Sequence, residues 1–283
     1  MSGSAAGPAG AVVTGAGRGL GRLIAAMLVE RGHRVLVTDA DEESARATAA
    51  ALGPEVPWAA VDVRDEEQVA SARDRIVAQA GRLDVWVNNA GVLVTGPVWE
   101  QSPATRRLML EVNALGAVNG TVAAIEAMRE TGRGHIVNIV SLAGLTAVPG
   151  EAVYAASKHA ALGFSLSTLA DLRLAGIEGI DISCVCPDGI WTPMLHDKLD
   201  DPASALSFSG KLLMPHEVVA AVRGVLDRPR PVTTVPRWRG WQVRLADALP
   251  WLGLRAMPLA VAQGRRAQRK LRRKGGPDLR DGG

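Results

Sequence analysis

The stretch A-V-V-T-G-A-G-R-G-L-G, residues 11–21, decides the fold of this chain. Its first residues are apolar or β-branched and predict a short buried strand, and the residues after Gly21 have the spacing of a helix. Between them, Gly15, Gly19 and Gly21 form the pattern G-x-x-x-G-x-G. Glycines allow a tight turn and a close approach of the backbone to a ligand, and the N-terminus of the following helix attracts negative charge. A strand, a glycine turn and a helix in this order predict a binding site for a pyrophosphate group.

Outward from this stretch, apolar runs alternate with helical patterns. The expected strands are residues 11–14, 34–38, 58–61, 85–88, 135–141, 180–186 and 232–235. The expected helices are residues 22–31, 42–52, 68–80, 108–128, a segment that begins at Tyr154, and 216–226. The strands are apolar almost throughout, which is typical of a parallel sheet covered on both faces. We therefore predict a single α/β domain with a doubly wound parallel sheet of seven strands.

The composition is that of a globular protein, with 283 residues, of which 47% are apolar and 22% charged. No apolar run has the length that spans a membrane, and the N-terminus lacks the basic start and apolar core of a signal peptide. We therefore expect a cytoplasmic protein. Cys184 and Cys186 alternate within an expected strand, so we expect two buried, unpaired thiols. The histidines lack metal-ligand spacing, and no metal is expected.

Asp39 ends the second expected strand, 18 residues after Gly21. A carboxylate at this place can accept hydrogen bonds from both hydroxyls of an adenosine ribose, and it would repel a 2′-phosphate. Arg18, inside the glycine turn, could instead hold that phosphate. The carboxylate is the closer charge, so we predict NAD as the cofactor, with NADP as the alternative.

The chain has a single tyrosine, Tyr154, which lies four residues before Lys158 and thirteen after Ser141. On a helix, residues i and i+4 share a face, so we expect the Lys158 ammonium beside the Tyr154 ring. At an effective dielectric constant of about 20, a unit charge about 4 Å away is worth roughly 4 kcal/mol. Desolvation acts in the opposite direction, and we expect a net lowering of the Tyr154 pKa. A phenol of this kind can act as a general acid or base near neutral pH.

Further motifs follow in order: N-N-A-G at residues 88–91, Asn113 in V-N-A-L-G, Ser141, and Y-x-x-x-K ending at Lys158. Together with the glycine turn, they resemble the short-chain dehydrogenase/reductase family, in its compact branch and not its extended epimerase branch. The resemblance covers about residues 8–236. It implies a Rossmann-like fold, a nicotinamide cofactor, oxidoreductase activity on an alcohol or ketone, and a homotetramer or homodimer.

The resemblance also implies a catalytic tetrad. Tyr154 would be the general acid/base, and Lys158 would bind the nicotinamide ribose and lower the pKa of Tyr154. Ser141, at the end of the fifth expected strand, would hydrogen-bond the substrate oxygen. Asn113 resembles a residue that interrupts a helix and holds a water molecule for proton relay.

By the same resemblance, the cofactor lies along the carboxyl ends of the strands. The positions implied to contact it are Gly15, Arg18, Gly19, Leu20, Gly21, Asp39, Asp62, Val63, Asn89, Ala90, Gly91, Tyr154, Lys158, Pro187 and Thr192. Among them, Asp62 and Val63 match a pair that meets the adenine ring, and Thr192 would meet the nicotinamide carboxamide. Asn88 resembles a structural residue that bridges central strands. Asp188 stands where the family has a glycine, which puts the local backbone path in doubt and adds a polar group near the substrate.

The segment between Thr192 and Pro215 covers the substrate in the family that the chain resembles. Its apolar residues, together with one flanking tryptophan, are Trp191, Met194, Leu195, Leu199, Leu206, Phe208, Leu212, Leu213 and Met214. We expect an apolar lid over a lipophilic secondary alcohol or ketone. The same side chains could equally pack the segment onto the body of the protein.

Residues 237–283 form a basic C-terminal extension beyond the resemblance. They carry 12 arginines and lysines against three aspartates, a net charge of +9, whereas residues 1–236 carry −6. The extension begins with W-R-G-W, and we expect Pro250 and Pro258 to divide it into short helices. One interpretation is a peripheral contact with an anionic membrane. The alternative is an oligomer-packing segment with a disordered, solubilising end, and nucleic-acid binding is not expected.

These observations predict an NAD-dependent alcohol dehydrogenase or ketoreductase with Tyr154 as general acid/base. Two alternatives stay open. One is an NADP-preferring carbonyl reductase that uses Arg18. The other is a non-catalytic NAD(P)-sensing scaffold, which would need the glycine turn but not Ser141, Tyr154 and Lys158 together.

Overall fold

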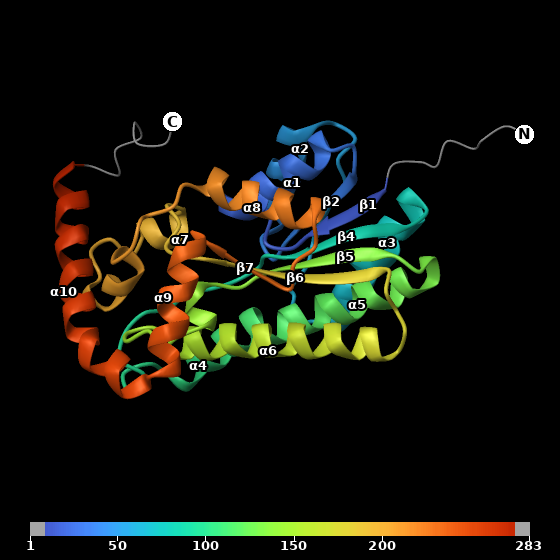
Figure 1. Cartoon of the computed structure of the whole chain (residues 1–283). Coiled ribbons are helices and arrows are strands. Elements are labelled where there is room, and N and C mark those ends of the chain that lie inside the picture. Colours follow the sequence, from blue (N-terminus) through green and yellow to red (C-terminus); the bar gives the residue numbers. More distant parts are fainter. Residues whose placement is uncertain (1–8, 275–283) are drawn as a thin grey trace, which may run out of the picture.

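The computed structural model describes residues 9–274, which form one parallel β-sheet with helices on both faces (Figure 1). The strands are β1 (Gly10–Val13), β2 (Arg34–Asp39), β3 (Trp58–Ala60), β4 (Leu83–Asn88), β5 (Gly134–Ile139), β6 (Ile180–Pro187) and β7 (Val232–Val235). Their order in the sheet is β3-β2-β1-β4-β5-β6-β7. The predicted doubly wound sheet of seven strands is confirmed, and the observed strand ends lie within two residues of the expected ones.

The helices form one layer on each face of the sheet (Figure 1). One layer contains α1 (Gly19–Glu30), α2 (Glu42–Leu52) and α8 (Pro215–Asp227), and the other contains α3 (Glu66–Ala80), α5 (Gly116–Thr131) and α6 (Ala152–Leu174). Successive strand residues divide between the two layers. Val13 packs in the cluster with α1 and α8, and Val12 packs in the cluster with α3 and α5. Both faces of each central strand are therefore apolar, as the sequence pattern predicted.

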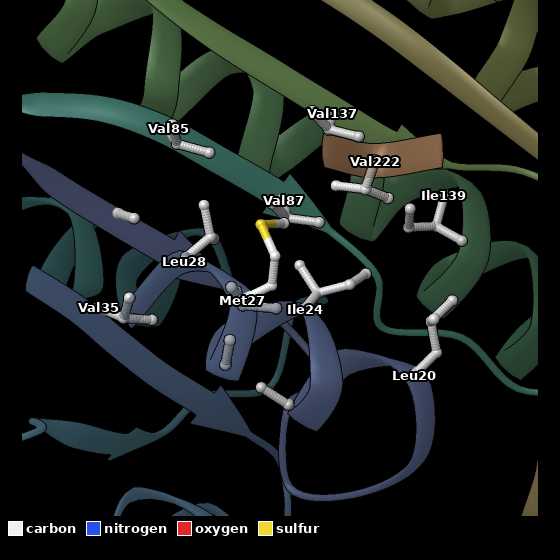
Figure 2. Packing of buried hydrophobic residues seen from close by; sticks show 14 of the residues in the cluster. Leu20, Ile24, Met27, Leu28, Val35, Val85, Val87, Val137, Ile139 and Val222 are labelled. Carbon is white, nitrogen blue, oxygen red and sulfur yellow. The ribbon is translucent and has the colours of Figure 1, made fainter. Parts of the chain in front are cut away.

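The helix that follows the glycine turn is anchored in this core. Three side chains of α1, Ile24, Met27 and Leu28, point toward the sheet and pack with Val87 of β4 and Val137 of β5 (Figure 2). All five are at most 2% exposed. Burying one side chain of this size contributes about 1.5–3 kcal/mol relative to leaving it exposed. The N-terminus of α1 is therefore held in a fixed position.

Helices α2 and α3 begin at aspartates that accept hydrogen bonds from the first turn. Asp41 Oδ1 accepts from the Glu43 N–H at 3.1 Å, and Asp65 Oδ1 accepts from the Glu67 N–H at 3.0 Å. Such caps satisfy backbone donors that the helix itself leaves free. Gly81, with φ of +79°, ends α3 in the left-handed conformation that glycine adopts readily.

The strand order changes direction at β1, which pairs with β2 on one side and with β4 on the other. The connections that follow β1 and β4 leave toward opposite faces of the sheet. In open parallel sheets, such a point leaves a crevice at the carboxyl ends of the strands, where ligands bind. The candidate site lies there.

A long helix crosses one face of the sheet. It joins α4 (Pro103–Leu110), a π-helical turn η1 (Glu111–Leu115) and α5 without a break. By length and composition, the segment Pro103–Thr131 could cross a membrane, which corrects the expectation that no segment reaches that length. However, 50% of its most apolar window is buried in the protein, and α5 packs on β4 and α3. It is a core helix.

Two further helices, α9 (Arg237–Ala248) and α10 (Pro250–Lys274), follow β7. Pro250 starts α10, where a proline is tolerated, but Pro258 lies inside the helix, so the expected break at Pro258 is wrong. A Cβ on Gly264 would overlap the carbonyl oxygen of Ala205, so α10 packs closely against the body at this glycine. Residues 1–8 and 275–283, which include most of the N-terminal segment and the end of the predicted extension, lie outside the described residues.

Candidate active site

A cavity of about 930 Å³ opens at the carboxyl ends of the strands. Its inner wall consists of the glycine turn and the segments that follow β2, β3, β4 and β5. Its outer wall consists of the segment after β6 together with α9 and α10. All the predicted cofactor and catalytic residues line this cavity except Asn113, which lies just behind it.

The glycine turn is fixed by close backbone contacts. Gly15 and Gly19 have φ values of +61° and +56°, in the left-handed region that favours glycine. A Cβ on Gly15 would lie 2.7 Å from Cα of Ala90, and a Cβ on Gly21 would overlap the carbonyl oxygen of Gly15. Any side chain at these two positions would push the turn away from α1 or from the end of β4.

The first turn of α1 is open toward the cavity. Its N-cap residue, Arg18, makes no side-chain capping bond, and the first turn has no acidic residue. The first N–H groups of a helix have no partner within the helix, and its dipole favours negative charge at this end. Gly19 and Leu20 of this turn line the cavity. The turn therefore fits the pyrophosphate of a dinucleotide.

Asp39 lies beside the glycine turn and is held in place by it. The Gly17 N–H donates to Asp39 Oδ2 at 2.9 Å, and the Asp41 N–H donates to Oδ1 at 3.1 Å. A Cβ on Gly17 would lie 2.8 Å from Asp39 Oδ2, so this glycine, which the sequence analysis did not single out, leaves room for the carboxylate. Arg18 is exposed and lines the same part of the cavity.

Asn89 fastens the end of β4 to the glycine turn. Its Nδ2 donates to the carbonyl oxygens of Thr14 and Gly15 at 3.0 and 2.9 Å. The Thr14 hydroxyl accepts in return from the N–H groups of Asn89 and Ala90, both at 3.1 Å. Asn88 bridges the strands behind it, donating to Oδ1 of Asn138 on β5 at 2.8 Å, so its predicted structural role is confirmed.

At the predicted adenine site, Asp62 is engaged by a residue that the sequence analysis missed. Arg64 Nε donates to both carboxylate oxygens of Asp62, at 3.0 and 2.9 Å, and this hydrogen bonding lowers the pKa of Asp62. Val63 is buried against Gly116, where a Cβ would lie 2.5 Å from Val63 Cγ2. Arg64 lines the cavity next to Asp62, and it supplies a cation at this end.

Ser141, Tyr154 and Lys158 meet at the centre of the inner wall. Tyr154 and Lys158 lie one turn apart on α6, and the Lys158 Nζ is 5.8 Å from the centre of the Tyr154 ring. Lys158 is 5% exposed and donates to the carbonyl oxygen of Ile139 at 2.9 Å. Ser141 follows β5, and its Oγ accepts from the Ala143 N–H at 3.1 Å at the start of the short helix η2 (Leu142–Gly144). The predicted proximity of the tyrosine and the lysine is thus observed.

The predicted lowering of the Tyr154 pKa is wrong for the protein chain alone. Burial raises the pKa of Tyr154, the negative charge of Glu151 adds to the rise, and the Ser141 hydroxyl opposes it. Burial also lowers the pKa of Lys158 to about 8. Removal of water from both groups therefore outweighs the attraction between ammonium and phenolate on which the sequence argument relied.

Asn113 lies in the π-helical turn η1, where the helix that carries it is interrupted, as the resemblance implied. It is 2% exposed, and its amide makes three hydrogen bonds. Oδ1 accepts from the Val92 N–H at 2.8 Å, while Nδ2 donates to the Val92 carbonyl at 2.9 Å and to Ser157 Oγ at 3.0 Å. Ser157 in turn donates to the Tyr154 carbonyl at 2.6 Å. The side chain therefore supports the tyrosine helix, and a relay role stays a prediction.

Asp188, the departure from the family pattern, is paired with the C-terminal extension. Its Oδ2 lies 3.1 Å from Arg239 Nε, and its Oδ1 accepts from the Gly189 N–H at 2.9 Å. Burial raises the pKa of Asp188, and Arg239 opposes the rise. The Arg239 guanidinium also donates to Ser209 Oγ at 3.1 Å. The added acid is thus an anchor for α9, and its main-chain N–H keeps a strand-like bond of 2.8 Å to the Val235 carbonyl.

The segment after β6 contains the helix α7 (Pro193–His196) and the 3-10 helix η3 (Pro202–Phe208), and α10 runs along its outside (Figure 1). Gln268 of α10 donates to the Asp201 carbonyl at 2.8 Å and to Ser204 Oγ at 2.9 Å. Of the apolar residues expected in the lid, Met194, Leu195 and Leu206 line the cavity. Others, such as the buried Phe208 and Leu213, pack onto the body, so the segment does both, and its role as a lid over a lipophilic substrate stays a prediction.

The outer wall also contains residues that the sequence analysis missed. Apolar side chains of α9, of α10 and of Leu249 between them line the cavity, namely Val243, Leu245, Leu249, Leu252 and Met257. Glu151, at the start of α6, lines it as well and is 2% exposed. Cys184 and Cys186 are buried free thiols, as predicted. Within residues 9–274, no group of three His, Cys, Asp or Glu side chains is placed to share a metal ion.

Comparison with known proteins agrees with this geometry. A family profile described as "short chain dehydrogenase" matches residues 9–203. The chain belongs to the short-chain dehydrogenase family. The profile of this family ends within η3, so β7, α9 and α10 lie beyond the matched region.

Individual members of the short-chain dehydrogenase family extend the comparison. The chain is 36% identical over 219 residues to cyclopentanol dehydrogenase of Comamonas sp., covering 75% of this chain and 86% of that protein. It is 38% identical over 196 residues to the sex determination protein tasselseed-2 of Zea mays, covering 65% of this chain and 56% of that protein. A short-chain dehydrogenase/reductase from Burkholderia phymatum, solved in complex with NAD, superimposes with a TM-score of 0.78 at 27% identity, covering 89% of this chain and 97% of that chain.

Proposed function

We propose that this short-chain dehydrogenase transfers a hydride between a nicotinamide cofactor and a lipophilic secondary alcohol or ketone. Tyr154 would be its general acid/base. The observation that carries the proposal is that Ser141, Tyr154 and Lys158 meet in one largely apolar cavity that also contains the open N-terminus of α1. The similarity to a cyclopentanol dehydrogenase supports an apolar secondary alcohol as the substrate.

The proposed cofactor is NAD. The glycine turn would hold its pyrophosphate, Asp39 its adenosine ribose, and Lys158 its nicotinamide ribose. When bound, the nicotinamide supplies the hydride acceptor for alcohol oxidation and the hydride donor for ketone reduction. The NAD complex of the Burkholderia phymatum protein supports this choice. An NADP-preferring carbonyl reductase is the alternative, because the exposed Arg18 lines the same end of the cavity.

The side chains of the protein would transfer one proton between Tyr154 and the substrate oxygen. In ketone reduction, the Tyr154 hydroxyl would donate it to the carbonyl oxygen, and in alcohol oxidation the ionised Tyr154 would accept the hydroxyl proton. Ser141 would orient the same oxygen by a hydrogen bond. Burial raises the pKa of Tyr154, so the neutral phenol is the form that would donate the proton to a ketone. Lys158 would favour the ionised form while it carries its own proton, below its pKa of about 8.

The test is the formation of NADH from NAD with a panel of hydrophobic secondary alcohols, followed by absorbance. In the variant Tyr154→Phe, turnover should fall by roughly 10²- to 10⁴-fold, the usual contribution of a positioned general acid/base. The NAD affinity, measured by tryptophan fluorescence, should stay nearly unchanged. A non-catalytic sensing scaffold would keep its function in this variant. Failure of the unaltered protein to turn over any alcohol of the panel, with NAD or NADP, would contradict the proposal.

We also propose a homodimer or homotetramer in the cytoplasm, with a peripheral contact to anionic membranes through α9 and α10. Exposed apolar side chains on the outer face of the long helix and α6, among them Leu115, Val122 and Leu166, support self-association. For the membrane contact, the support is a group of exposed tryptophans and leucines on α9 and α10, namely Trp238, Trp241, Leu245, Trp251, Leu254 and Leu259. Arginines and lysines at residues 265–274 follow them, and each basic residue near an anionic surface contributes about 1 kcal/mol.

Flotation with phosphatidylglycerol vesicles tests the membrane contact. Trp241 and Leu259 are each 77% exposed, and replacing both with alanine should remove most of the binding without affecting the fold. Leu174, at the far end of α6, is 87% exposed, and Leu174→Ala should bind as the unaltered protein does. Equal flotation of the two variants, or equal binding to neutral phosphatidylcholine vesicles, would contradict a contact of this kind.

A further inference from the structure

Glu151 is an ionisable side chain enclosed in the wall of a largely apolar cavity. It is 2% exposed, and it lies at the N-cap of α6, three residues before Tyr154. Burial of a carboxyl group costs free energy unless the group finds hydrogen-bond partners. A glutamate at this position therefore requires an explanation.

Only one oxygen of Glu151 is engaged. The Ser207 hydroxyl of η3 donates to Oε1 at 2.6 Å, and none of residues 9–274 donates to Oε2. In this part of the chain, three side-chain atoms are fully enclosed by protein and lack a hydrogen-bond partner. They are Nε of Arg34, Oε1 of Gln101 and Oγ1 of Thr233. Glu151 Oε2 is not among them, so open space remains beside it. Since Glu151 lines the cavity, that space is the cavity.

Neither of two common structural roles, helix capping and ion pairing, uses the second carboxyl oxygen of Glu151, Oε2. Glu151 makes no side-chain bond to the first turn of α6, so it does not cap that helix through its carboxyl group. Among residues 9–274 it also has no cation as a partner, since the charged residues that act on it are the acids Asp201 and Asp188. Burial first and these acids second raise the pKa of Glu151 to about 7. Near neutral pH, its carboxyl group is thus available both as a donor and as an acceptor.

We propose that Glu151 recognises the substrate, with Oε2 hydrogen-bonded to a second oxygen-bearing group apart from the one that reacts. The inference rests on the proposed function. The substrate class then narrows to apolar secondary alcohols or ketones that carry another hydroxyl or carbonyl.

A series of linear alcohols tests this inference. The probes are 2-decanol and decanediols in which a second hydroxyl lies at increasing distance from the first. The unaltered protein should prefer one diol over 2-decanol by about 10- to 100-fold in kcat/KM, as expected when a buried carboxyl gains or loses its partner. In Glu151→Leu, this ratio should fall toward one. Glu151→Gln keeps an acceptor for Ser207, and it should reduce the ratio to an intermediate value.

A control variant separates recognition from a role in holding η3. Gln268→Ala loosens η3 from α10 without touching Glu151, so it should retain the preference for the diol. Three results would overturn the inference. The first is loss of the preference for the diol in Gln268→Ala, and the second is the same ratio of kcat/KM for diol over 2-decanol in Glu151→Leu and the unaltered protein. The third is that the unaltered protein prefers no diol over 2-decanol. Failure of the proposed function would look different, because neither 2-decanol nor any diol would then be oxidised.

Discussion

The wall of the cavity that faces the predicted cofactor site and the wall that faces the substrate are built in different ways. On the cofactor side, short segments at the ends of adjacent strands contact one another, and backbone atoms make many of the bonds, such as those of the Gly17 N–H with Asp39 and of Asn89 with the Gly15 carbonyl. The other side, where the substrate is proposed to bind, is closed by side chains of α9 and α10. Arg239 bonds Asp188, and Gln268 bonds Asp201 and Ser204 in the segment after β6.

The difference indicates which residues would determine the specificity for the cofactor and which would determine the specificity for the substrate. A site made of backbone atoms and glycines tolerates little change, because most substitutions there collide with the main chain. The substrate side is made of side chains on helices that follow the last strand, and its charged groups lie in a poorly hydrated cavity. Its stability should therefore respond to pH near neutrality and to the loss of a single ion pair. The cofactor side should lose stability only at acidic pH, where Asp62 becomes protonated.

The largest expected effect concerns the pH dependence of stability on the substrate side. The pKa of Glu151 is raised from its ordinary value of 4.5 to about 7 in the folded protein. Between these pH values, the folded state holds a proton that the unfolded state has released, so the free energy of unfolding falls as pH rises. The loss is on the order of 3 kcal/mol and is complete above pH 7. Glu151→Gln should remove this fall, as measured by urea unfolding from pH 4 to 8.

The pH dependence of stability must be compared between the unaltered protein and Glu151→Gln, because His135 also contributes to it. Burial lowers its pKa to about 4, so its contribution to stability rises with pH between about 4 and 6.5, opposite in sign to that of Glu151. His135 contributes equally to the free energy of unfolding of the unaltered protein and of Glu151→Gln. Its contribution therefore drops out when one free energy is subtracted from the other. The same pH dependence in both proteins would show that Glu151 is not the group responsible.

A smaller effect is expected when the ion pair that joins α9 to the substrate segment is broken. The side chains of Asp188 and Arg239 are 9% and 22% exposed, and Arg239→Met would leave the acid without its partner. We expect a loss of about 2 kcal/mol in the free energy of unfolding, less than for a fully buried pair. The KM for an apolar alcohol should rise as α9 loosens, while the dissociation constant for NAD should not change.

Arg73 provides the matched control for this prediction. It pairs with Asp74 and Glu126 on the surface, where the acids are 68% and 59% exposed. Arg73→Met should cost at most about 1 kcal/mol and leave both binding constants unchanged. A rise in the dissociation constant for NAD in Arg239→Met would mean that the two walls are coupled, and the contrast between them would fail.

The smallest effect is expected on the cofactor side. Asp39→Asn removes one negative charge and keeps an acceptor for the Gly17 N–H. In a well-hydrated setting, a unit charge at about 4 Å is worth roughly 1 kcal/mol, so the ratio of kcat/KM for NAD over NADP should fall about fivefold. Asp41→Asn, whose carboxylate instead bonds Glu43 and Ser44, should change the ratio less. An equal change in both variants would contradict the assignment of Asp39 to the ribose.

Local sequence patterns were sufficient for the sheet, the glycine turn, Asp39 and the pair of Tyr154 and Lys158, whereas the resemblance to the family supplied the other candidate site residues. Nearly continuous apolar runs predict strands that are buried on both faces, and parallel strands bring their carboxyl ends to one edge. The spacing of Tyr154 and Lys158 fixes their shared face on α6. These features depend on neighbours within a few residues, so the sequence alone could predict them.

Other features depend on contacts that no local pattern contains. The direction of the Tyr154 pKa is a balance between burial and nearby charge, and burial is known only from the packed structure. The partner of Asp188 lies 51 residues away, on a helix outside the family profile. α10 continues through Pro258 and packs against η3, and neither feature is contained in the local sequence. Glu151 was missed because its neighbourhood in the sequence shows no sign that it faces a cavity.

The position of α9 and α10 at the end of the chain has a consequence for how substrate range can change in this protein. The two helices contribute no strand to the sheet and none of the residues that the family resemblance assigns to cofactor or catalysis. They are held to the rest of the protein by polar contacts of Arg239 and Gln268 and by the packing of α10 against η3. Under the proposed function, sequence changes confined to these two helices would alter the substrate entrance and leave the proposed hydride-transfer residues in place.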